Sequence, residues 1–348
     1  VLRDIKKVAI IGGGTMGGGI AMCFANVGIP VVMVEVTDEA LQRGLGIIKK
    51  NYSITVQKGK LAEDQMEGLL GLISGTTDYN DIADVDMVIE AVYENLELKK
   101  QIFTKLDGVC KQGAILASNT SYQDIDQIAA ATKRPQDVLG LHFFSPANVM
   151  KLLEVVRGEK TADDVLATSM AIGKKIQKVC ALSRVCYGFI GNRMLGGYGR
   201  ESQMLLMDGC LPTQVDSALE GFGMAMGPLA MGDLAGLDVG YKARQGRTDL
   251  PDDPKLYRMG TLLVEMGRHG QKTGAGFYKY DPETRRRLAD PIVEGMIVDE
   301  SNKLDIGRRE IDNEEILARC LYPLINEGAL ILSDYIYLST NLLLSEAA

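Results

Sequence analysis

Histidine is scarce in this chain, and the residues that build metal centres are scattered along it. The 348 residues include two histidines, His142 and His269, and six cysteines without a C-x-x-C pair. Structural zinc sites take cysteine and histidine ligands at short, regular spacings, so no metal site is expected. The scatter also argues against a disulfide framework, and we interpret the thiols as reduced packing residues in a reducing compartment.

Several features of nucleic-acid-binding, membrane and secreted proteins are missing as well. Acidic residues outnumber basic ones by 46 to 38, the net charge is −8, and the basic residues are dispersed. This distribution argues against a nucleic-acid or anionic-membrane surface. No apolar run reaches the roughly 18 residues of a membrane span, and the N-terminus shows no signal-peptide pattern. The first residue is Val1, which suggests processing or excision from a longer chain.

The composition that remains is typical of folded globular proteins. Hydrophobic residues make up 46% of the chain and charged residues 24%, a balance that gives no indication of disorder. A chain of this length has room for about two or three domains with sizeable cores.

The first motif is a glycine-rich turn near the N-terminus, between a short apolar run and a helical pattern. It reads Gly-Gly-Gly-Thr-Met-Gly from Gly12. In a G-x-G-x-x-G turn, Gly12 permits the tight bend, Gly14 lets backbone approach a pyrophosphate, and Gly17 lets helix and strand pack closely. A second apolar run, residues 30–36, carries Glu35 about 20 residues after the turn, where a carboxylate binds adenosine ribose. The pattern predicts dinucleotide binding, and Glu35 favours NAD because it would repel the 2′-phosphate of NADP.

Strand and helix patterns alternate through the rest of the first half. Residues 38–72 are helical, and strand-like runs at 86–92 and 114–117 each precede a helical stretch, at 96–109 and 124–131. Alternation of this kind is the signature of a parallel, doubly wound sheet. Ligands of such sheets bind beyond the carboxyl ends of the strands.

Two groups of polar residues in this half allow more than one interpretation. Glu94 and the Ser-Asn-Thr-Ser quartet at residues 118–121 follow strand-like runs, where they serve either a ligand or the cap of the next helix. Four lysines of the helical stretch form either a solvated face or a contact with the phosphates of a coenzyme A substrate. They are Lys49, Lys50, Lys58 and Lys60.

The stretch over residues 138–157 sets a histidine opposite a glutamate. Apolar, β-favouring runs flank a segment that carries Pro146 and Asn148, which predicts an antiparallel hairpin. In a hairpin centred on Asn148, His142 faces Glu154, and opposed residues have Cβ atoms roughly 4.5 to 5.5 Å apart. An imidazole oriented by a carboxylate is a good general base near neutral pH, but a structural His-Glu pair explains these residues alone equally well.

The chain from about residue 184 onward is helical, rich in glycine and methionine, and contains a weak internal repeat. Five residues recur with the same spacings: Arg193, Leu195, Glu201, Leu205 and Leu206 correspond to Arg319, Leu321, Glu327, Ile331 and Leu332. The repeat predicts two related helical units. Pro282 and the basic run at residues 285–287 are interpreted as the linker between them.

Taken in order, a series of motifs resembles the L-3-hydroxyacyl-CoA dehydrogenases. They are the glycine turn with Glu35, Glu94-Asn95, the Ser-Asn-Thr-Ser quartet, His-Phe-Phe-Ser-Pro, Leu-Glu-Val-Val, Gly-Phe-Ile-Gly-Asn-Arg, Met-Gly-Pro and Gly-Gln-Lys-Thr-Gly-Ala-Gly-Phe. The resemblance covers roughly residues 5–280. The later run Glu-Ile-Leu-Ala-Arg-Cys-Leu-Tyr-Pro-Leu-Ile-Asn-Glu is similar to the second helical unit of multifunctional fatty-acid oxidation enzymes.

The resemblance implies roles for individual residues. In the catalytic set, His142 would be the base and Glu154 its orienting partner, while Ser121 and Asn192 would contact the substrate at the reacting centre. The NAD site would include Gly12, Gly14, Met16, Gly17, Glu35, Glu94, Lys99, Ser121, Ser145 and Lys272. Apart from the resemblance, Lys58 is the residue among the four lysines named above that we expect to contact the coenzyme A part of the substrate.

We therefore expect an α/β fold with a Rossmann-type doubly wound sheet, followed by an all-α C-terminal region. The expected domains are an NAD-binding domain at residues 1–183, a helical dehydrogenase domain at 184–281, and a second, partial helical unit at 282–348. The expected reaction is NAD-dependent oxidation of L-3-hydroxyacyl-CoA to 3-ketoacyl-CoA in fatty-acid β-oxidation.

The expected partners are an acyl-CoA substrate and either a second copy of the chain or a covalently linked hydratase half. A second copy would bind through the helical region, and a hydratase half would belong to a longer multifunctional protein. The location would be cytoplasmic in a bacterium and peroxisomal in a eukaryote.

Two departures from the family pattern and two rival functions stay open. Ser145 stands where many relatives have asparagine and Tyr187 where they have proline, which affects nicotinamide contact and the interdomain hinge. An FAD-dependent oxidoreductase would explain the glycine turn and Glu35 but not the hairpin. A non-catalytic dinucleotide-binding protein would explain only the first half, and it would not need His142 and Glu154 together.

Overall fold

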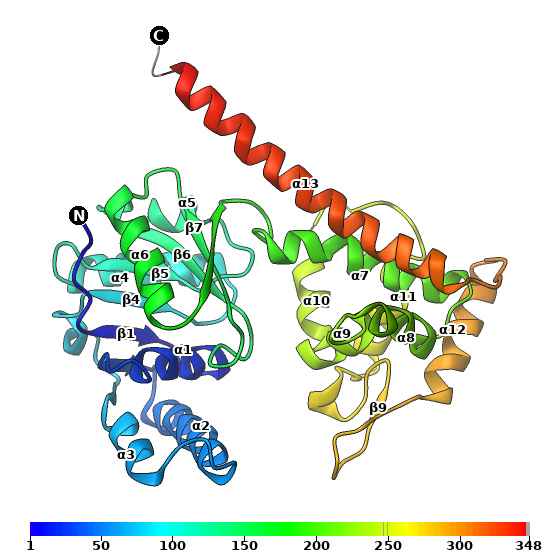
Figure 1. Ribbon diagram of the computed structural model, residues 1–348, viewed down its shortest axis with the longest axis horizontal. Helices are drawn as coiled ribbons and strands as arrows, with labels where there is room; N and C mark the ends of the chain where they lie inside the picture. Colours follow the sequence, from blue (N-terminus) through cyan, green and yellow to red (C-terminus); the bar gives the residue numbers. More distant parts are fainter. Residues whose placement is uncertain (246, 249, 346–348) are drawn as a thin grey trace. The chain divides into compact units, whose positions relative to one another are not determined.

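The computed structural model describes residues 1–245, 247–248 and 250–345, with side chains up to residue 334. The chain divides into two compact units, Val1–Phe189 and Ile190–Ala348. Each unit has its own hydrophobic core residues. The first unit runs from blue to green in Figure 1, and the second from green to red.

The first unit is built around an eight-stranded sheet in the order β3-β2-β1-β4-β5-β6-β7-β8. Neighbouring strands are parallel except β6 and β7, which are antiparallel. The order reverses between β1 and β4, as in a doubly wound Rossmann-type sheet, which confirms the predicted fold class. The elements are β1 (Val8–Ile11), α1 (Thr15–Ala25), β2 (Val31–Val34), α2 (Asp38–Gln57), α3 (Glu63–Gly71), β3 (Ile73–Thr76), η1 (Tyr79–Ile82), β4 (Met87–Glu90), α4 (Leu96–Val109), β5 (Ile115–Ser118), α5 (Ile125–Ala129), η2 (Pro135–Asp137), β6 (Val138–Phe143), β7 (Leu152–Arg157), α6 (Asp163–Lys175) and β8 (Val179–Arg184).

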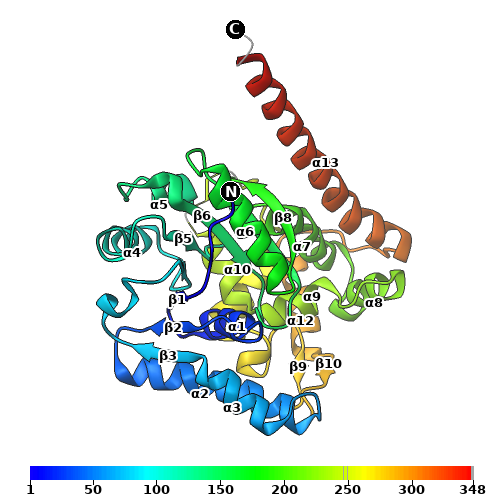
Figure 2. The same ribbon diagram turned by 60° about the vertical axis from the view of Figure 1, so that its left-hand side comes forward.

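Successive residues of each strand point to opposite faces of this sheet, and each face has its own core. Val8 and Ile10 of β1 belong to the core under α1, α2 and α6. Ala9 and Ile11 belong to the core under α4 and α5. Strand β1 is therefore buried throughout, as expected for a parallel strand covered on both faces. Helices α2 and α3 lie side by side in both views (Figure 1, Figure 2), and both contact β3.

The two edge strands, β3 and β8, were not expected from the sequence. An edge strand pairs on one side only. Each of these two strands has one buried residue, which is Ile73 in β3 and Ser183 in β8. Strand β3 (Ile-Ser-Gly-Thr) lacks the continuous apolar run of the central strands, and the apolar residues that begin β8 are not buried as those of the central strands are. Helix α4, by contrast, begins and ends at the expected residues, and the Asn95 side chain caps it by accepting from the amide of Leu98.

Helices dominate the described residues of the second unit, which also contain one short antiparallel pair of strands. Helices α7 and α13 carry the two copies of the sequence repeat and lie side by side (Figure 1). The elements are α7 (Gly191–Asp208), α8 (Pro212–Phe222), α9 (Pro228–Ala235), α10 (Leu237–Arg244), α11 (Arg258–Glu265), η3 (Gln271–Thr273), β9 (Lys279–Tyr280), β10 (Arg287–Leu288), α12 (Pro291–Lys303) and α13 (Asn313–Ser345).

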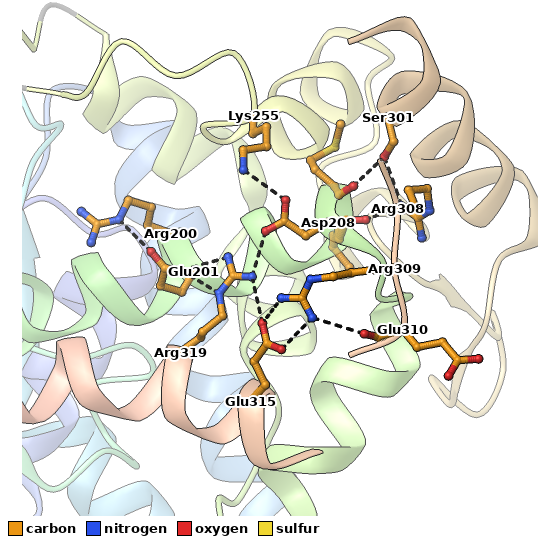
Figure 3. A network of polar contacts seen from close by, with 12 residues as sticks. Arg200, Glu201, Asp208, Lys255, Ser301, Arg308, Arg309, Glu310, Glu315 and Arg319 are labelled. Atoms are coloured by element: carbon orange, nitrogen blue, oxygen red, sulfur yellow. Dashed lines mark hydrogen bonds and ion pairs between the residues drawn. The ribbon is translucent and has the colours of Figure 1, made fainter. Parts of the chain in front are cut away.

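Equivalent residues of the two repeat copies pair reciprocally across the contact between α7 and α13. Arg193 donates to Glu327 at 2.5 Å, and Arg319 donates to Glu201 at 3.1 Å. The two helices are therefore antiparallel, and the exchange resembles a two-fold interface between identical subunits. Arg319 also donates to Asp208 at 2.8 Å. This contact ties the start of α13 to the end of α7 (Figure 3).

The segment after Pro282 is not a simple linker, and the sequence-based expectation was wrong on this point. Arg287 lies in β10, opposite Tyr280 of β9, and its guanidinium donates to both carboxylate oxygens of Glu220. The first two arginines of the run, at residues 285–286, are exposed, as residues of a linker would be. Through this ion pair Arg287, the third arginine of the run, holds the β9–β10 hairpin against α8.

Two buried aspartates explain glycines in the C-terminal motifs. Asp216 of α8 accepts hydrogen bonds from two first-turn amides of α9, and Asp233 of α9 accepts from the two amides after Gly276. A Cβ at Gly227 would lie 2.2 Å from Cγ of Asp216, and one at Gly276 would lie 2.0 Å from Oδ1 of Asp233. The Met-Gly-Pro and Gly-Ala-Gly-Phe motifs therefore need glycine where these carboxylates pack.

Among the described residues, one helical segment, Asn313–Asp334 of α13, is long and apolar enough to cross a membrane by length and composition alone. Charged residues such as Arg319 and Glu327 interrupt this segment, so it contains no unbroken apolar run of the length of a membrane span. Such a match is weak, because packed helices of folded domains meet the same criterion. Arg319 and Glu327 of this segment pair with α7 of the same unit.

Candidate active site

The hairpin expected around His142 is present, with the expected register. Strands β6 and β7 pair antiparallel, and His142 stands opposite Glu154. Nδ1 of the imidazole lies 2.6 Å from Oε2 of the carboxylate, and the two side chains are 4% and 0% exposed. A neutral imidazole that donates its Nδ1 proton to Glu154 leaves Nε2 as the acceptor for a substrate proton.

Aromatic rings and a backbone hydrogen bond hold the imidazole in place. The rings of Phe144 and Phe189 lie 4.5 and 5.6 Å from the imidazole, measured between centroids. The amide of Phe143 donates to the side-chain oxygen of Asn119 at 2.9 Å, which ties the end of β6 to the segment after β5. The position of His142 therefore depends on three neighbouring elements as well as on its own strand.

The glycine turn has the geometry of a phosphate cradle. Gly12 has φ +99°, and a Cβ there would lie 2.9 Å from the carbonyl oxygen of Ala91. A Cβ at Gly17 would lie 1.8 Å from the carbonyl oxygen of Gly12, whereas space around Gly14 is open. Helix α1 begins at Thr15 without a side-chain cap, so its first-turn amides can bind an anion. These residues fit the pyrophosphate of a dinucleotide.

Glu35 lies at the end of β2, beside the same turn. Its Oε1 accepts from the amide of Gly13 at 2.6 Å, and its Oε2 accepts from the amide of Val36 at 3.0 Å. Each carboxylate oxygen has two lone pairs, so the anchored group keeps capacity to accept ribose hydroxyls. The sequence predicted Glu35 near the glycine turn, and its contact with the adenosine ribose of NAD stays a prediction.

A second group of predicted residues meets at the carboxyl ends of β4 and β5. The carboxylate of Glu94 accepts from the amide of Ser121 at 3.0 Å. Lys99 is 1% exposed, and its Nζ lies 2.7 Å from Oε1 of Glu90. The structure thus brings Ser121, Glu94 and Lys99 into one hydrogen-bonded group.

The remaining predicted residues of the first unit have less specific surroundings. Met16 lies in the first turn of α1 and packs partly against the core. Ser145 lies in the loop after β6 and precedes the cis peptide bond to Pro146. Lys58 is exposed at the C-terminal cap of α2. Their contacts with a coenzyme or a substrate stay predictions.

Two predicted residues belong to the second unit. Asn192 lies in the first turn of α7, and Lys272 lies in η3, where it forms an ion pair with Asp238. Their contributions to catalysis and to NAD binding also stay predictions.

Sequence reasoning missed two residues of the site, Glu90 and Asn119. Glu90 ends the apolar run of β4, and it is 0% exposed. A charged residue at the end of a buried strand was a usable signal, because such a group needs a partner charge. Asn119 was named only as a member of its quartet. Its hydrogen bond to β6 depends on the pairing of β5 with β6, which no local pattern indicates.

Both units match domains of known protein families. The 3-hydroxyacyl-CoA dehydrogenase, NAD binding domain matches residues 7–185, and the 3-hydroxyacyl-CoA dehydrogenase, C-terminal domain matches residues 188–280. The peroxisomal bifunctional enzyme of Danio rerio is 42% identical over 96% of this chain and 48% of its own length. The fatty acid oxidation complex subunit alpha of Pseudomonas putida is 37% identical over 96% and 47%. The chain spans about half the length of these relatives.

Solved structures agree with this assignment. The dehydrogenase part of multifunctional enzyme 1 from C. elegans superposes with a TM-score of 0.70 at 31% identity, covering 97% of this chain and 76% of that one. The (S)-3-hydroxybutyryl-CoA dehydrogenase of Ralstonia eutropha gives 0.74 at 36% identity, covering 80% and 100%. The glycine turn, the anchored Glu35 and the His142–Glu154 pair on a sheet of this order are consistent with these matches. The chain therefore belongs to the 3-hydroxyacyl-CoA dehydrogenase family, and the NAD-binding domain of that family forms its first unit.

Proposed function

We propose that this chain catalyses the NAD-dependent oxidation of L-3-hydroxyacyl-CoA to 3-ketoacyl-CoA in fatty-acid β-oxidation. The observation that carries the proposal is the buried His142–Glu154 pair, with 2.6 Å between Nδ1 and Oε2, on the same sheet as the glycine turn. Membership of the dehydrogenase family supports the reaction class. Relatives named as bifunctional and fatty acid oxidation enzymes support the metabolic setting.

NAD, when bound, supplies the acceptor for the hydride that leaves C3 of the substrate. Gly12, Gly14 and Gly17 would hold its pyrophosphate against the first turn of α1, and Glu35 would hold its adenosine ribose.

His142 carries the proton chemistry of the proposed reaction. Its Nε2 accepts the proton of the C3 hydroxyl as the carbonyl forms, and Glu154 stabilises the imidazolium that results. The pair is almost fully buried, and a low local dielectric strengthens this interaction. In the reverse direction the imidazolium donates the proton. Ser121 and Asn192 would hold the substrate oxygen and the thioester end.

The test is turnover by the purified chain with NAD and a series of L-3-hydroxyacyl-CoA substrates of increasing chain length. NADH absorbance should rise with at least one of them, and the series would define the chain-length preference. A folded chain that binds NAD but forms no NADH with any substrate of the series would contradict the proposal.

We also propose a finer division of the chain, with an NAD-binding domain at residues 1–183, a helical domain at 184–281 and a second, partial helical unit at 282–348. The reciprocal ion pairs between α7 and α13 support the relation of the last two. In the full-length protein a hydratase half could be covalently linked, as in relatives named bifunctional enzymes.

The proposed location follows the source of the chain. Relatives include peroxisomal enzymes of eukaryotes and a fatty acid oxidation subunit of a bacterium. We propose a peroxisomal location in a eukaryote and a cytoplasmic one in a bacterium. Imaging of the tagged full-length protein in its own host tests this.

A further inference from the structure

A loop of the first unit follows His142 and has no role in the reaction steps proposed above. Residues 144–151 connect β6 to β7, and this loop begins two residues after His142. Strand β6 runs parallel to β5, β4 and β1, so the loop leaves the sheet at the edge that carries the glycine turn. Ligands of doubly wound sheets bind at this edge.

The proposed reaction brings the loop near the nicotinamide end of NAD. The hydride leaves C3 of the substrate, and the proton leaves the oxygen bonded to C3. Reacting atoms must approach to about 3 to 3.5 Å, so the nicotinamide ring and the imidazole of His142 would both lie close to that carbon. The loop that follows His142 would therefore lie beside the nicotinamide. Ser145 is the residue of this loop for which the family resemblance implies a coenzyme contact.

Lys178, in the turn between α6 and β8, binds the backbone of this loop. Its Nζ donates to the carbonyl oxygen of Ala147 at 2.5 Å and to that of Met150 at 2.7 Å. The two carbonyls belong to a turn in which the amides of Val149 and Met150 both donate to the carbonyl oxygen of Pro146. An ammonium that bridges two carbonyls holds them at a fixed separation, so the shape of the loop depends on Lys178.

The end of α6 fixes the position of Lys178 in turn. Gln177 has φ +62°, and the amide of Lys178 donates to the carbonyl oxygen of Gly173 at 2.9 Å. A left-handed residue followed by such a hydrogen bond is a common way to end a helix. Among the ion pairs of the residues that the structure describes, none involves Lys178. Its charge therefore serves the two carbonyls of the loop.

The loop also packs against α1, the helix whose first turn forms the phosphate cradle. Ala147 is 1% exposed, and its carbonyl oxygen accepts from Sγ of Cys23 at 3.4 Å as well as from Lys178. A Cβ at Gly19 would lie 3.1 Å from Cβ of Ala147. The loop is thus held between α1 and Lys178, on the path from the phosphate cradle to His142.

We infer that Lys178 is a positioning residue, which holds the loop between β6 and β7 against the nicotinamide end of NAD and acts through Ser145. The inference rests on the proposed function, which places the nicotinamide and His142 at the same carbon. Glu35 and the glycine turn bind the other end of the coenzyme from different elements. Loss of Lys178 should therefore affect the nicotinamide end and leave the adenosine end unchanged.

The first test compares Lys178→Met with Lys175→Met. Lys175 is exposed in the last turn of α6, which makes it a matched control. Calorimetry measures the affinity of each variant for NADH and for ADP-ribose, which lacks the nicotinamide. We expect Lys178→Met to bind NADH roughly tenfold more weakly, as for the loss of one hydrogen bond, and to bind ADP-ribose as the wild type does. Lys175→Met should change neither affinity.

Turnover and a conservative variant extend this test. We expect kcat of Lys178→Met to fall by roughly 10- to 100-fold, because small misplacements of reacting groups are costly. Lys178→Arg keeps the positive charge and several N–H donors, so it should retain most of the NADH affinity and of kcat. If the lysine contributed only its apolar stem, methionine would serve as well as arginine. Should Lys178→Met not fold, Lys178→Gln provides the same comparison, because its amide still donates to a carbonyl.

A double-mutant cycle with Ser145→Ala tests the route of the effect. If Lys178 acts through Ser145, Lys178→Met has little further effect on NADH affinity once Ser145 is alanine. Additive losses, equal losses of NADH and ADP-ribose affinity, or unchanged NADH affinity would overturn the inference. A wild-type chain that forms no NADH with any substrate overturns the proposed function, whereas the two binding measurements still decide whether Lys178 positions the loop.

Discussion

Gly197 of α7 lies directly against Pro323 of α13, at the centre of the contact between the two repeated helices. A Cβ at Gly197 would lie 2.7 Å from Cβ of Pro323. The two residues occupy the same position in the sequence repeat, and the two reciprocal ion pairs lie on either side of them. A local two-fold axis therefore passes through this contact, where the absence of a side chain lets the helices approach.

Neighbouring glycines of α7 should respond oppositely to the same substitution. Gly197→Ala should destabilise the chain by roughly 1 to 3 kcal/mol, because the added methyl group meets Pro323. Gly196→Ala should be neutral or stabilising, by up to about 1 kcal/mol, since a Cβ there meets nothing within 4 Å and alanine favours the helix. Urea unfolding of both variants measures the difference. Equal effects would show that the close approach of the helices is wrong.

Removal of residues 282–348 should cost much of the stability of the second unit. The truncation removes Arg287 with its pairing to Glu220, and it removes buried apolar side chains such as Ile316 and Ile331. Each large buried apolar side chain contributes about 1.5 to 3 kcal/mol. Thermal unfolding and association state of a chain that ends at Asp281 should both differ from those of the whole chain. Unchanged values would show that α13 does not pack against α7.

Asp233 should make the stability of the second unit depend on pH. Burial raises its pKa from 3.8 to about 6, so the folded state binds this proton more tightly than the unfolded state. The stability from Asp233 is therefore fully present below about pH 4 and is lost as pH rises through about 6, on the order of 3 kcal/mol.

The measurement compares the wild type with Asp233→Asn by urea unfolding at several pH values across this window. The wild type should lose stability relative to the variant as pH rises. The variant also lacks one acceptor for the amides after Gly276. This loss changes its free energy of unfolding by an amount that does not vary with pH. Asp252→Asn, at an exposed site, is the control. A constant difference across the window would contradict the raised pKa of Asp233.

The His142–Glu154 pair should behave as a catalytic unit. His142→Gln should lower kcat by a factor of about 10² to 10⁴, equivalent to roughly 3 to 5 kcal/mol of barrier, with NAD affinity nearly unchanged. Glu154→Gln keeps the shape but removes the charge that stabilises the imidazolium, so its loss should be smaller than the loss from His142→Gln. Steady-state kinetics of the single and double variants should show losses well short of additive.

His269→Gln provides the control for the pair, because it changes the other histidine of the chain. It should leave kcat unchanged. A folded His142→Gln variant that keeps most of its turnover would reduce the hairpin to a structural role.

Glu35 should set the choice between NAD and NADP. Its carboxylate is anchored by the amide of Gly13, at the place where the adenosine ribose is expected, and it would repel a 2′-phosphate. We expect kcat/KM to favour NAD by on the order of tenfold or more. Glu35→Gln keeps the hydrogen bond from the amide of Gly13 and removes the charge. It should therefore reduce the ratio of kcat/KM for NAD to kcat/KM for NADP. Equal kcat/KM values for the two coenzymes in the wild type would show that Glu35 lies elsewhere.

Local patterns in the sequence were sufficient wherever neighbouring residues determine the structure. The glycine turn needs its particular spacing because Gly12 has a positive φ and Gly17 packs against its carbonyl oxygen. The pairing of His142 with Glu154 follows from strand alternation about a single turn, so the register of this hairpin was predictable. The bounds of α4 follow from its cap and its apolar spacing.

Other features were decided by contacts between segments that are distant in the chain. The sequence shows that Lys99 and Arg287 are charged, but only the folded chain places one beside Glu90 and the other beside Glu220. The edge strand β3 (Ile73–Thr76) lacks a strand pattern and exists because β2 offers it a partner. A local sequence pattern indicates which face of a helix or strand is apolar. It does not indicate which group pairs with a buried charge or with an open strand edge. That pairing depends on packing between distant segments, which the tertiary structure alone determines.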